Sequence, residues 1–315
     1  MKVIMVRVII LGLIIAAAGI VFIIIVPAAP RAESPVLQTE FTETPPEQSS
    51  RAEQVVKALV QAYPGRVERA EFRTQNNDWA VLLRGTWYYY AEGRLLPEEL
   101  LDRAARYSPI AFYNYPRELP PWTEPSAEQV NRFRDIERAR AAGQPPRPHY
   151  FFDALYRANN RDESYERVKS MRFLGIQLTV HYSIMEELSL VEEQILTAAR
   201  TDRQVRSWVD NINTLAGWSW RTVADTRSRS FHSYGVAIDI LPKLQGGREI
   251  YWLWAGPGCW NIPYERRYHP PDAVIKAFES YGFVWGGKWL FFDAMHFEYR
   301  PEVFILNGIE LSTLR

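Results

Sequence analysis

Two histidines and an aspartate in the C-terminal third of the chain have residue types that could hold a metal ion. The stretch "SRSFHSYGVAID", residues 228–239, carries His232 and Asp239, and "DAMHFEYR", residues 293–300, carries His296. A buried imidazole beside a buried carboxylate is costly unless a cation lies between them. Two imidazoles and one carboxylate suit zinc, and three protein ligands leave a fourth position for water. The sequence therefore predicts a catalytic zinc site at these three side chains.

The spacing between the first two candidate ligands requires a turn. In a regular strand His232 and Asp239, seven residues apart, would face opposite sides. The residues Ser233, Tyr234 and Gly235 are suitable for a turn or bulge, since glycine accepts a positive φ angle. We therefore expect His232 at a turn and Asp239 on the strand that follows it.

Two further carboxylates lie close to His296. Asp293, three residues before it, is the predicted general base that takes a proton from the attacking water. Glu298 is the competing candidate, and it lies two residues after His296, on the same side of a strand. We assign Glu298 to orienting the His296 ring.

An arginine is expected where negative charge develops on the substrate. Arg221, in "WSWRTV", stands among aromatic residues in a predicted strand, and we expect it to stabilise an oxyanion or a substrate carboxylate. Arg227 and Arg229 are rivals in a stretch that reads as an exposed loop. Ser230 is predicted to hydrogen-bond Asp239 or the substrate.

The other histidines and the cysteine are assigned no chemistry. His149, His181 and His269 are predicted to be structural residues with satisfied hydrogen bonds. Cys259 is the single cysteine, so the chain cannot form an internal disulfide.

Helices and short strands must position these side chains. Apolar spacing predicts an amphipathic helix over 183–200, a second helix over 202–216 and a third over 271–282. Short strands are expected in "WSWRTV", "GVAIDILP", "GFVWGG" and "MHFEYR". The fold class is therefore α+β, with a small antiparallel sheet and helices. We place this domain at 180–305, followed by a tail at 306–315.

The part of the chain before this domain is predicted to contain a small folded unit and a connecting segment. A helix over 50–63 and apolar runs on both sides of Arg84-Gly85 predict a helix-plus-hairpin unit at 50–105. Residues 106–179 are proline-rich at first and are predicted to be a connecting segment, with a charged helix over 126–143.

The N-terminus predicts a membrane anchor. Residues 8–26 contain no charge, and nineteen helical residues span roughly 28 Å, close to the thickness of the hydrocarbon layer. Lys2 and Arg7 precede this span, which places the N-terminus in the cytoplasm. We assign 1–28 to a cytoplasmic tip and transmembrane anchor, and 29–49 to a flexible stalk. A signal peptide cleaved near "VPAA", residues 26–29, is the alternative.

Charge and composition limit the partners. The 37 basic and 37 acidic residues cancel, so no strong field would attract nucleic acid. With the anchor, this predicts a single-pass protein of the cytoplasmic membrane whose C-terminal domain is extracytoplasmic.

The candidate site residues also form a sequence motif. The order is Ser230-x-His232-x-x-Gly235-x-Ala237-x-Asp239, and then Asp293-x-x-His296-Phe297-Glu298. Over about 180–305 this resembles the zinc peptidases of the D-alanyl-D-alanine carboxypeptidase family. With "YGFVWGGKWLFFDAMHFEY", it looks most like their L-alanyl-D-glutamate peptidase branch.

The resemblance implies a fold, an activity and roles. The fold would be that shared by these peptidases and the hedgehog domain. His232, Asp239 and His296 would hold Zn²⁺, Asp293 would be the base, and Arg221 would bind substrate. The implied activity is hydrolysis of peptidoglycan stem peptides by an L-alanyl-D-glutamate type endopeptidase. The alternatives are a D-alanyl-D-alanine carboxypeptidase or dipeptidase, and a zinc-containing cell-wall-binding module without turnover.

Overall fold

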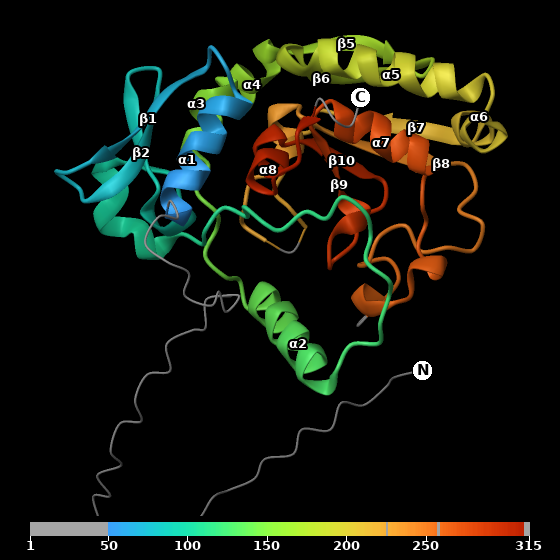
Figure 1. Ribbon diagram of the computed structural model, residues 1–315, viewed down its shortest axis with the longest axis horizontal. Helices are drawn as coiled ribbons and strands as arrows, with labels where there is room; N and C mark the ends of the chain where they lie inside the picture. Colours follow the sequence, from blue (N-terminus) through green and yellow to red (C-terminus); the bar gives the residue numbers. More distant parts are fainter. Residues whose placement is uncertain (1–49, 225, 257–258, 312–315) are drawn as a thin grey trace, which may run out of the picture. The chain divides into compact units, whose positions relative to one another are not determined.

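The computed structural model describes residues 50–224, 226–256 and 259–311 (Figure 1). The predicted membrane span at 8–26 and the stalk at 29–49 lie outside these residues. In the part of the chain that is described, no helix is both long and apolar enough to cross a bilayer. The described residues all belong to one compact unit, Ser49–Arg315.

The N-terminal region of this unit is a helix against a four-stranded antiparallel sheet. Its elements are α1 (Arg51–Ala62), β1 (Val67–Arg73), β2 (Asp78–Leu83), β3 (Thr86–Tyr89) and β4 (Leu96–Pro97), and the strand order is β1-β2-β3-β4. Ser50 caps α1 by accepting a hydrogen bond from the Glu53 backbone N–H at 3.3 Å. The predicted helix and the hairpin at Arg84-Gly85 are confirmed.

The middle region contains more structure than the predicted connecting segment. Its elements are α2 (Ala127–Ala141), α3 (Tyr150–Tyr156), α4 (Arg161–Arg167), β5 (Val168–Phe173) and β6 (Ile176–His181). The charged helix is confirmed as α2, with a capping box at Ser126 and Gln129. The helices α3 and α4 have seven residues each, which is too short for a clear helical period.

The C-terminal region carries the candidate ligands. Its helices are α5 (Met185–Ala199), α6 (Arg203–Asp210), α7 (Asp272–Ser280) and α8 (Pro301–Leu306). Its strands are β7 (Ile212–Ala216), β8 (Ala237–Pro242), β9 (Phe283–Trp285) and β10 (His296–Tyr299), in the antiparallel order β7-β8-β10-β9. The predicted α+β class with a small antiparallel sheet is confirmed.

Two element predictions in this region are wrong. The helix expected over 202–216 ends at Asp210, and the chain continues as β7, where the β-branched Ile212 and Thr214 favour a strand. The strand expected at "WSWRTV" is an irregular loop with one isolated bridge between Thr222 and Arg229. Aromatic residues alone gave a misleading strand signal there.

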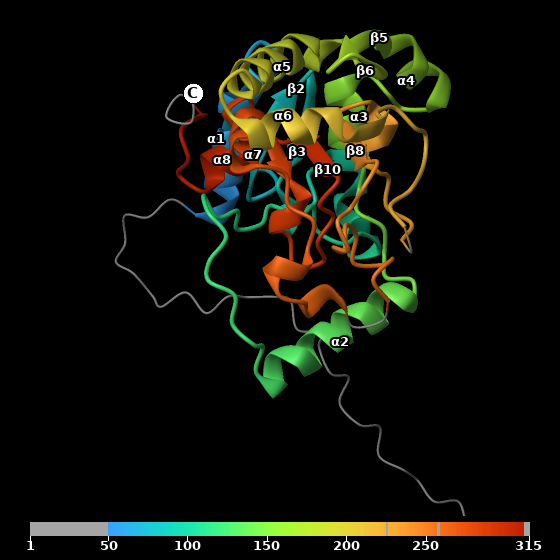
Figure 2. The same ribbon diagram turned by 90° about the vertical axis from the view of Figure 1, so that its right-hand side faces the viewer.

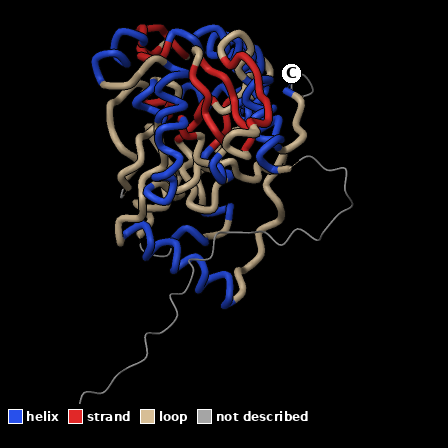
Figure 3. Tube along the Cα trace, turned by 90° about the vertical axis from the view of Figure 1, so that its left-hand side faces the viewer, coloured by secondary structure: helices blue, strands red, loops and turns tan. Residues whose placement is uncertain are grey.

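Views from two further sides show how the elements are grouped (Figures 2 and 3). Helix α5 and the β5–β6 hairpin lie at one end of the described residues, and α2 lies at the other. The N-terminal and C-terminal regions share one hydrophobic core, which includes Val55 and Leu59 of α1 as well as Phe278 and Phe297. The boundaries predicted at residues 105 and 179 stay predictions.

Candidate metal centre

Neighbouring strands and a short turn bring the three predicted ligands together. His296 of β10 lies opposite Asp239 of β8 in the antiparallel register, so both side chains project from the same face. His232 comes from a 3₁₀ turn, η4 (Phe231–Tyr234), which ends at Gly235 with φ 72°. A Cβ atom on Gly235 would lie 2.8 Å from the His181 backbone nitrogen, so this tight turn requires glycine.

The ligand atoms converge on one point. The distance from His296 Nδ1 to Asp239 Oδ1 is 2.8 Å, and that from His232 Nε2 to the same oxygen is 3.2 Å. The two ring nitrogens, His232 Nε2 and His296 Nδ1, are 3.3 Å apart. His232 and His296 are buried, and Asp239 is 9% exposed. The turn and strand predicted for His232 and Asp239 are thus present, although the turn is a 3₁₀ helix.

The remaining ring nitrogens are fixed by other partners. His232 Nδ1 lies 2.6 Å from the Gly217 carbonyl oxygen, and His296 Nε2 lies 3.1 Å from Glu298 Oε2. Each ring therefore turns its other nitrogen toward the cluster. Such outer contacts set the tautomer and orientation of metal-binding histidines.

This donor set fits zinc. Tetrahedral ligands at about 2.0–2.1 Å from Zn²⁺ lie about 3.3 Å from one another, and two of the three separations here are 3.2 and 3.3 Å. Two imidazoles and a carboxylate are also zinc's usual donors. In the described residues, His232, Asp239 and His296 are the one group whose ligand atoms lie close enough to hold a metal, all within 4.8 Å of one another.

Asp239 and His296 shift each other's pKa values. Burial acts to raise the pKa of Asp239, but hydrogen bonds from His232 and His296 outweigh it and lower the pKa below its usual range. Burial acts to lower the pKa of His296, but the hydrogen bonds to Asp239 and Glu298 raise it well above its usual value. A carboxylate that is charged when buried is the form that a cation needs.

Asp293 lies next to this cluster and is held by its backbone. Its N–H donates to the Gly286 carbonyl at 3.0 Å, and its carbonyl accepts from the His296 N–H at 3.1 Å. Burial raises the pKa of Asp293 to about 7. Its buried Oδ1 atom has no hydrogen-bond partner among the described residues. A buried oxygen left without a donor beside the cluster is compatible with a role toward water or substrate.

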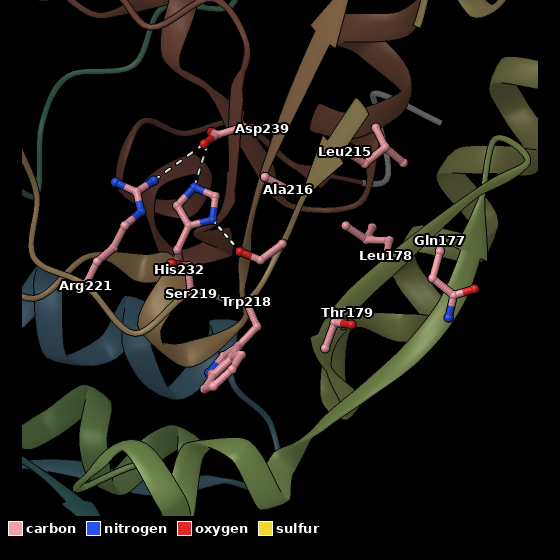
Figure 4. Close-up of a pocket in the computed structure, with 11 residues that line it drawn as sticks. Gln177, Leu178, Thr179, Leu215, Ala216, Trp218, Ser219, Arg221, His232 and Asp239 are labelled. Carbon is pink, nitrogen blue, oxygen red and sulfur yellow. Dashed lines mark hydrogen bonds and ion pairs between the residues drawn. The ribbon is translucent and has the colours of Figure 1, made fainter. Parts of the chain in front are cut away.

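A pocket of about 470 Å³ opens beside the cluster, and Figure 4 shows the residues that line it. It is lined by residues of β6 and β7, by the loop that follows β7, and by His232 and Asp239. Arg221 lines it too, with Nη2 at 3.5 Å from Asp239 Oδ2 and a side chain that is 43% exposed. This arginine is therefore both near the cluster and accessible.

The rival arginines and Ser230 have other contacts. Arg229 pairs with the buried Asp153, and Arg227 donates to the Gly143 carbonyl at 3.0 Å. The Ser230 hydroxyl accepts a hydrogen bond from the His232 backbone N–H at 3.3 Å, where it caps the turn. The predicted bond from Ser230 to Asp239 or to the substrate stays a prediction.

The remaining histidines lie in structural settings. His181 Nδ1 accepts from the Ser183 N–H at 3.1 Å, and its Nε2 lies 3.0 Å from the Tyr156 carbonyl oxygen. His149 pairs with Asp153 at 2.7 Å, and the His269 ring packs edge-on against Trp285.

Sequence reasoning missed contacts made by backbone atoms and by distant residues. The Gly217 carbonyl that fixes His232 carries no side-chain signal. Arg300, whose Nη1 lies 3.3 Å from Glu298 Oε1, directly follows the "HFEY" strand and could have been found there. The β6 wall of the pocket lies in the stretch read as a connection.

Comparison with known proteins agrees with this geometry. Residues 224–299 match the family model described as D-alanyl-D-alanine carboxypeptidase. This relates the stretch that holds the cluster and Asp293 to a peptidase family. Arg221 lies just outside the matched stretch. Residues 55–112 match a domain family of unknown function. Searches of curated proteins and of solved structures gave no match.

Proposed function

We propose that this protein is a zinc-dependent peptidase that hydrolyses peptidoglycan stem peptides, most specifically as an L-alanyl-D-glutamate type endopeptidase. One observation carries the proposal. His232, Asp239 and His296 converge with Asp293 beside them, inside a stretch that matches a peptidase family. The specific branch is supported by the "GFVWGG" pattern and by an aspartate, rather than a glutamate, at the position of the base.

The chain's own residues have distinct tasks in this reaction. His232, Asp239 and His296 would hold the ion, and the Gly217 carbonyl and Glu298 keep the two rings oriented. When bound, zinc supplies Lewis acidity that polarises the scissile carbonyl and acidifies water. Asp293 accepts the proton of the attacking water at its carboxylate and delivers it to the leaving amine, as the C–N bond breaks and a new C–O bond forms.

Arg221 is the group that meets negative charge on the substrate. Its guanidinium lines the pocket and is accessible, so it can donate hydrogen bonds to a developing oxyanion or to a substrate carboxylate. Because the guanidinium is charged, its hydrogen bonds to an anionic oxygen are stronger than those of a neutral donor.

The proposed place of action is the outer side of the cytoplasmic membrane. The uncharged stretch at 8–26, with Lys2 and Arg7 before it, supports a single membrane anchor with the peptidase domain outside. Peptidoglycan peptides and the membrane are the proposed partners, and the balanced charge argues against nucleic acid.

Products of digestion test the proposal. The full-length protein, loaded with zinc, is incubated with defined muropeptides, and the products are weighed by mass spectrometry with and without a chelator. We expect cleavage after the first L-alanine that stops when the chelator is added. A protein that binds muropeptides and never cuts them would be a wall-binding module.

A second candidate is a D-alanyl-D-alanine carboxypeptidase, which the description of the matching family favours. The same digestion separates the two. Loss of the terminal D-alanine from a pentapeptide stem, without a cut after L-alanine, would select the carboxypeptidase.

A further inference from the structure

Two strand edges face each other beside the metal cluster. Strand β7 is the outer strand of its sheet, and β6 is the second strand of the two-stranded β5–β6 hairpin. The two edges meet where the Trp218 N–H donates to the Thr179 carbonyl at 2.7 Å. Gly217 makes this contact possible, because a Cβ atom there would lie 2.1 Å from the same carbonyl oxygen. Away from this junction the two edges line the pocket (Figure 4).

The edge of β7 directs backbone groups into the pocket. The Ile240 N–H donates to the Met295 carbonyl at 2.8 Å, so the backbone of Ile240 faces away from β7. Leu215 lies opposite Ile240 in the register. In an antiparallel ladder, two residues that lie opposite each other and do not hydrogen-bond each other both direct their backbone groups away from the partner strand. Leu215 and Ile240 form such a pair. Leu215 therefore offers one donor and one acceptor to the pocket.

The edge of β6 also directs backbone groups into the pocket. The Thr179 carbonyl accepts from Trp218, outside the β5–β6 ladder, so Thr179 faces away from β5. Residues two apart on a strand direct their backbone groups to the same side. Gln177 therefore also presents its N–H and C=O to the pocket, which it lines.

The two facing edges of β6 and β7 lie close to the candidate metal ligands. Ala216 lies opposite Asp239, so Leu215 is one residue, about 3.4 Å, from the level of the cluster. Leu178, which is buried, and the half-buried Leu215 give the pocket an apolar part between the strands. Figure 4 shows Arg221, Asp239 and His232 on one side of the labelled set and Leu178, Leu215 and Gln177 on the other.

We infer that the pocket between β6 and β7 binds the substrate peptide as an added extended strand, hydrogen-bonded to the backbone of Leu215 and Gln177. The inference rests on the proposed function and specifies how the same site holds its substrate. A peptide repeats one N–H and one C=O per residue and so matches these edges, as in other cases of strand addition. A glycan chain has no such backbone repeat.

A proline substitution tests the contact with β7. Leu215→Pro removes the outward N–H but no bond to β8, and an edge position of this kind tolerates proline. Leu215→Ala, the control, also removes the branched end of the leucine side chain but keeps the N–H. We expect the Kd of a non-hydrolysable stem-peptide analogue, measured by calorimetry on the full-length zinc-loaded protein, to be about 3- to 10-fold weaker for Leu215→Pro than for Leu215→Ala. Zinc affinity should be equal in the two variants.

Equal Kd values for two folded variants would overturn the inference. If Leu215→Pro does not fold, the wild-type protein is titrated with analogues that are N-methylated at one amide at a time. At least one methylated analogue should then bind 10-fold more weakly or worse, and uniform binding across the series would overturn the inference. This binding test does not depend on turnover. If the analogue binds as a strand but the protein cleaves no muropeptide, the peptidase proposal is refuted and the inference about binding stands.

Discussion

His296 uses its two ring nitrogens for two tasks. Nδ1 joins the ligand cluster, and Nε2 lies 3.1 Å from Glu298 Oε2. Glu298 is itself buried and held by Arg300 at 3.3 Å. This chain of contacts fixes the direction of Nδ1, because the ring cannot turn without breaking the contact to Glu298.

We expect Glu298→Gln to weaken zinc binding by about 10- to 100-fold, since the amide cannot support His296 as the carboxylate does. A competition titration with a chromophoric chelator measures the affinity. Glu279→Gln is the control, because Glu279 is also a buried glutamate but pairs with Lys288 at 2.6 Å. An unchanged zinc affinity in Glu298→Gln would show that His296 is held by packing alone.

Asp293 has the position of a base without being one of the three clustered donors. Asp293→Asn should lower kcat by about 10²- to 10⁴-fold, because the amide cannot accept the proton. The bound zinc, counted by atomic absorption, should stay at one per chain. His232→Ala is the contrasting variant and should lose the metal. If Asp293→Asn kept wild-type kcat, the base would have to be another residue.

At the scale of elements, regular patterns were predictable and irregular ones were not. The period of α5 and the cap of α1 follow from side chains within one or two turns. The cluster was predictable because its three donors are rare residue types in an apolar context. The β6 wall of the pocket was not, since its backbone groups matter and its side chains carry no pattern. The loop at Trp218 was misread because its shape depends on contacts with Thr179 and His232, far away in sequence.

The turn after β9 positions Asp293. A Cβ atom on Gly286 would lie 2.6 Å from the Asp293 carbonyl oxygen, so Gly286→Ala must displace one of the two backbones. We expect kcat to fall at least about 10-fold, because small displacements of catalytic groups are costly. Gly85→Ala is the control: φ is 76° there but the space is open, so stability should fall without loss of kcat. Equal kcat in both variants would mean that the turn adapts.

At the scale of the whole molecule, stability should depend on pH through His181. Burial, with smaller contributions from Arg66 and Arg167, lowers the pKa of His181 to about 4. The folded state thus binds fewer protons than the unfolded state, whose histidine has a pKa of about 6.5. This stabilisation is complete above pH 6.5 and is lost as the pH falls toward 4.

Between pH 8 and pH 5 the loss should be about 2 kcal/mol in the free energy of unfolding. Urea unfolding of the wild type and of His181→Gln at several pH values measures it. The variant should be less stable at pH 8 and should lack this part of the pH dependence. Parallel curves for the two proteins would assign the acid sensitivity to other groups.

The N-terminal region completes the core of the region that holds the cluster. The hydroxyl of Tyr63, the residue that follows α1, donates to the buried Glu302 at 2.7 Å, and Arg300 Nη2 donates to the Ala111 carbonyl at 3.1 Å. Removing these partners leaves buried polar groups unpaired, at about 1–3 kcal/mol each, and exposes the apolar surface that α1 covers. Such losses are comparable with the total stability of a domain.

We therefore expect the piece 180–305 to lack a cooperative thermal transition, whereas 50–315 should unfold in one transition. Near-ultraviolet circular dichroism and binding of a hydrophobic dye distinguish a packed fold from a loose one. A cooperative transition of 180–305 near the Tm of the longer piece would make the N-terminal region a separate attachment. The expected result would instead explain why the matched stretch 224–299 occurs here together with the second matched stretch, 55–112. Each of the two lacks part of its core without the other.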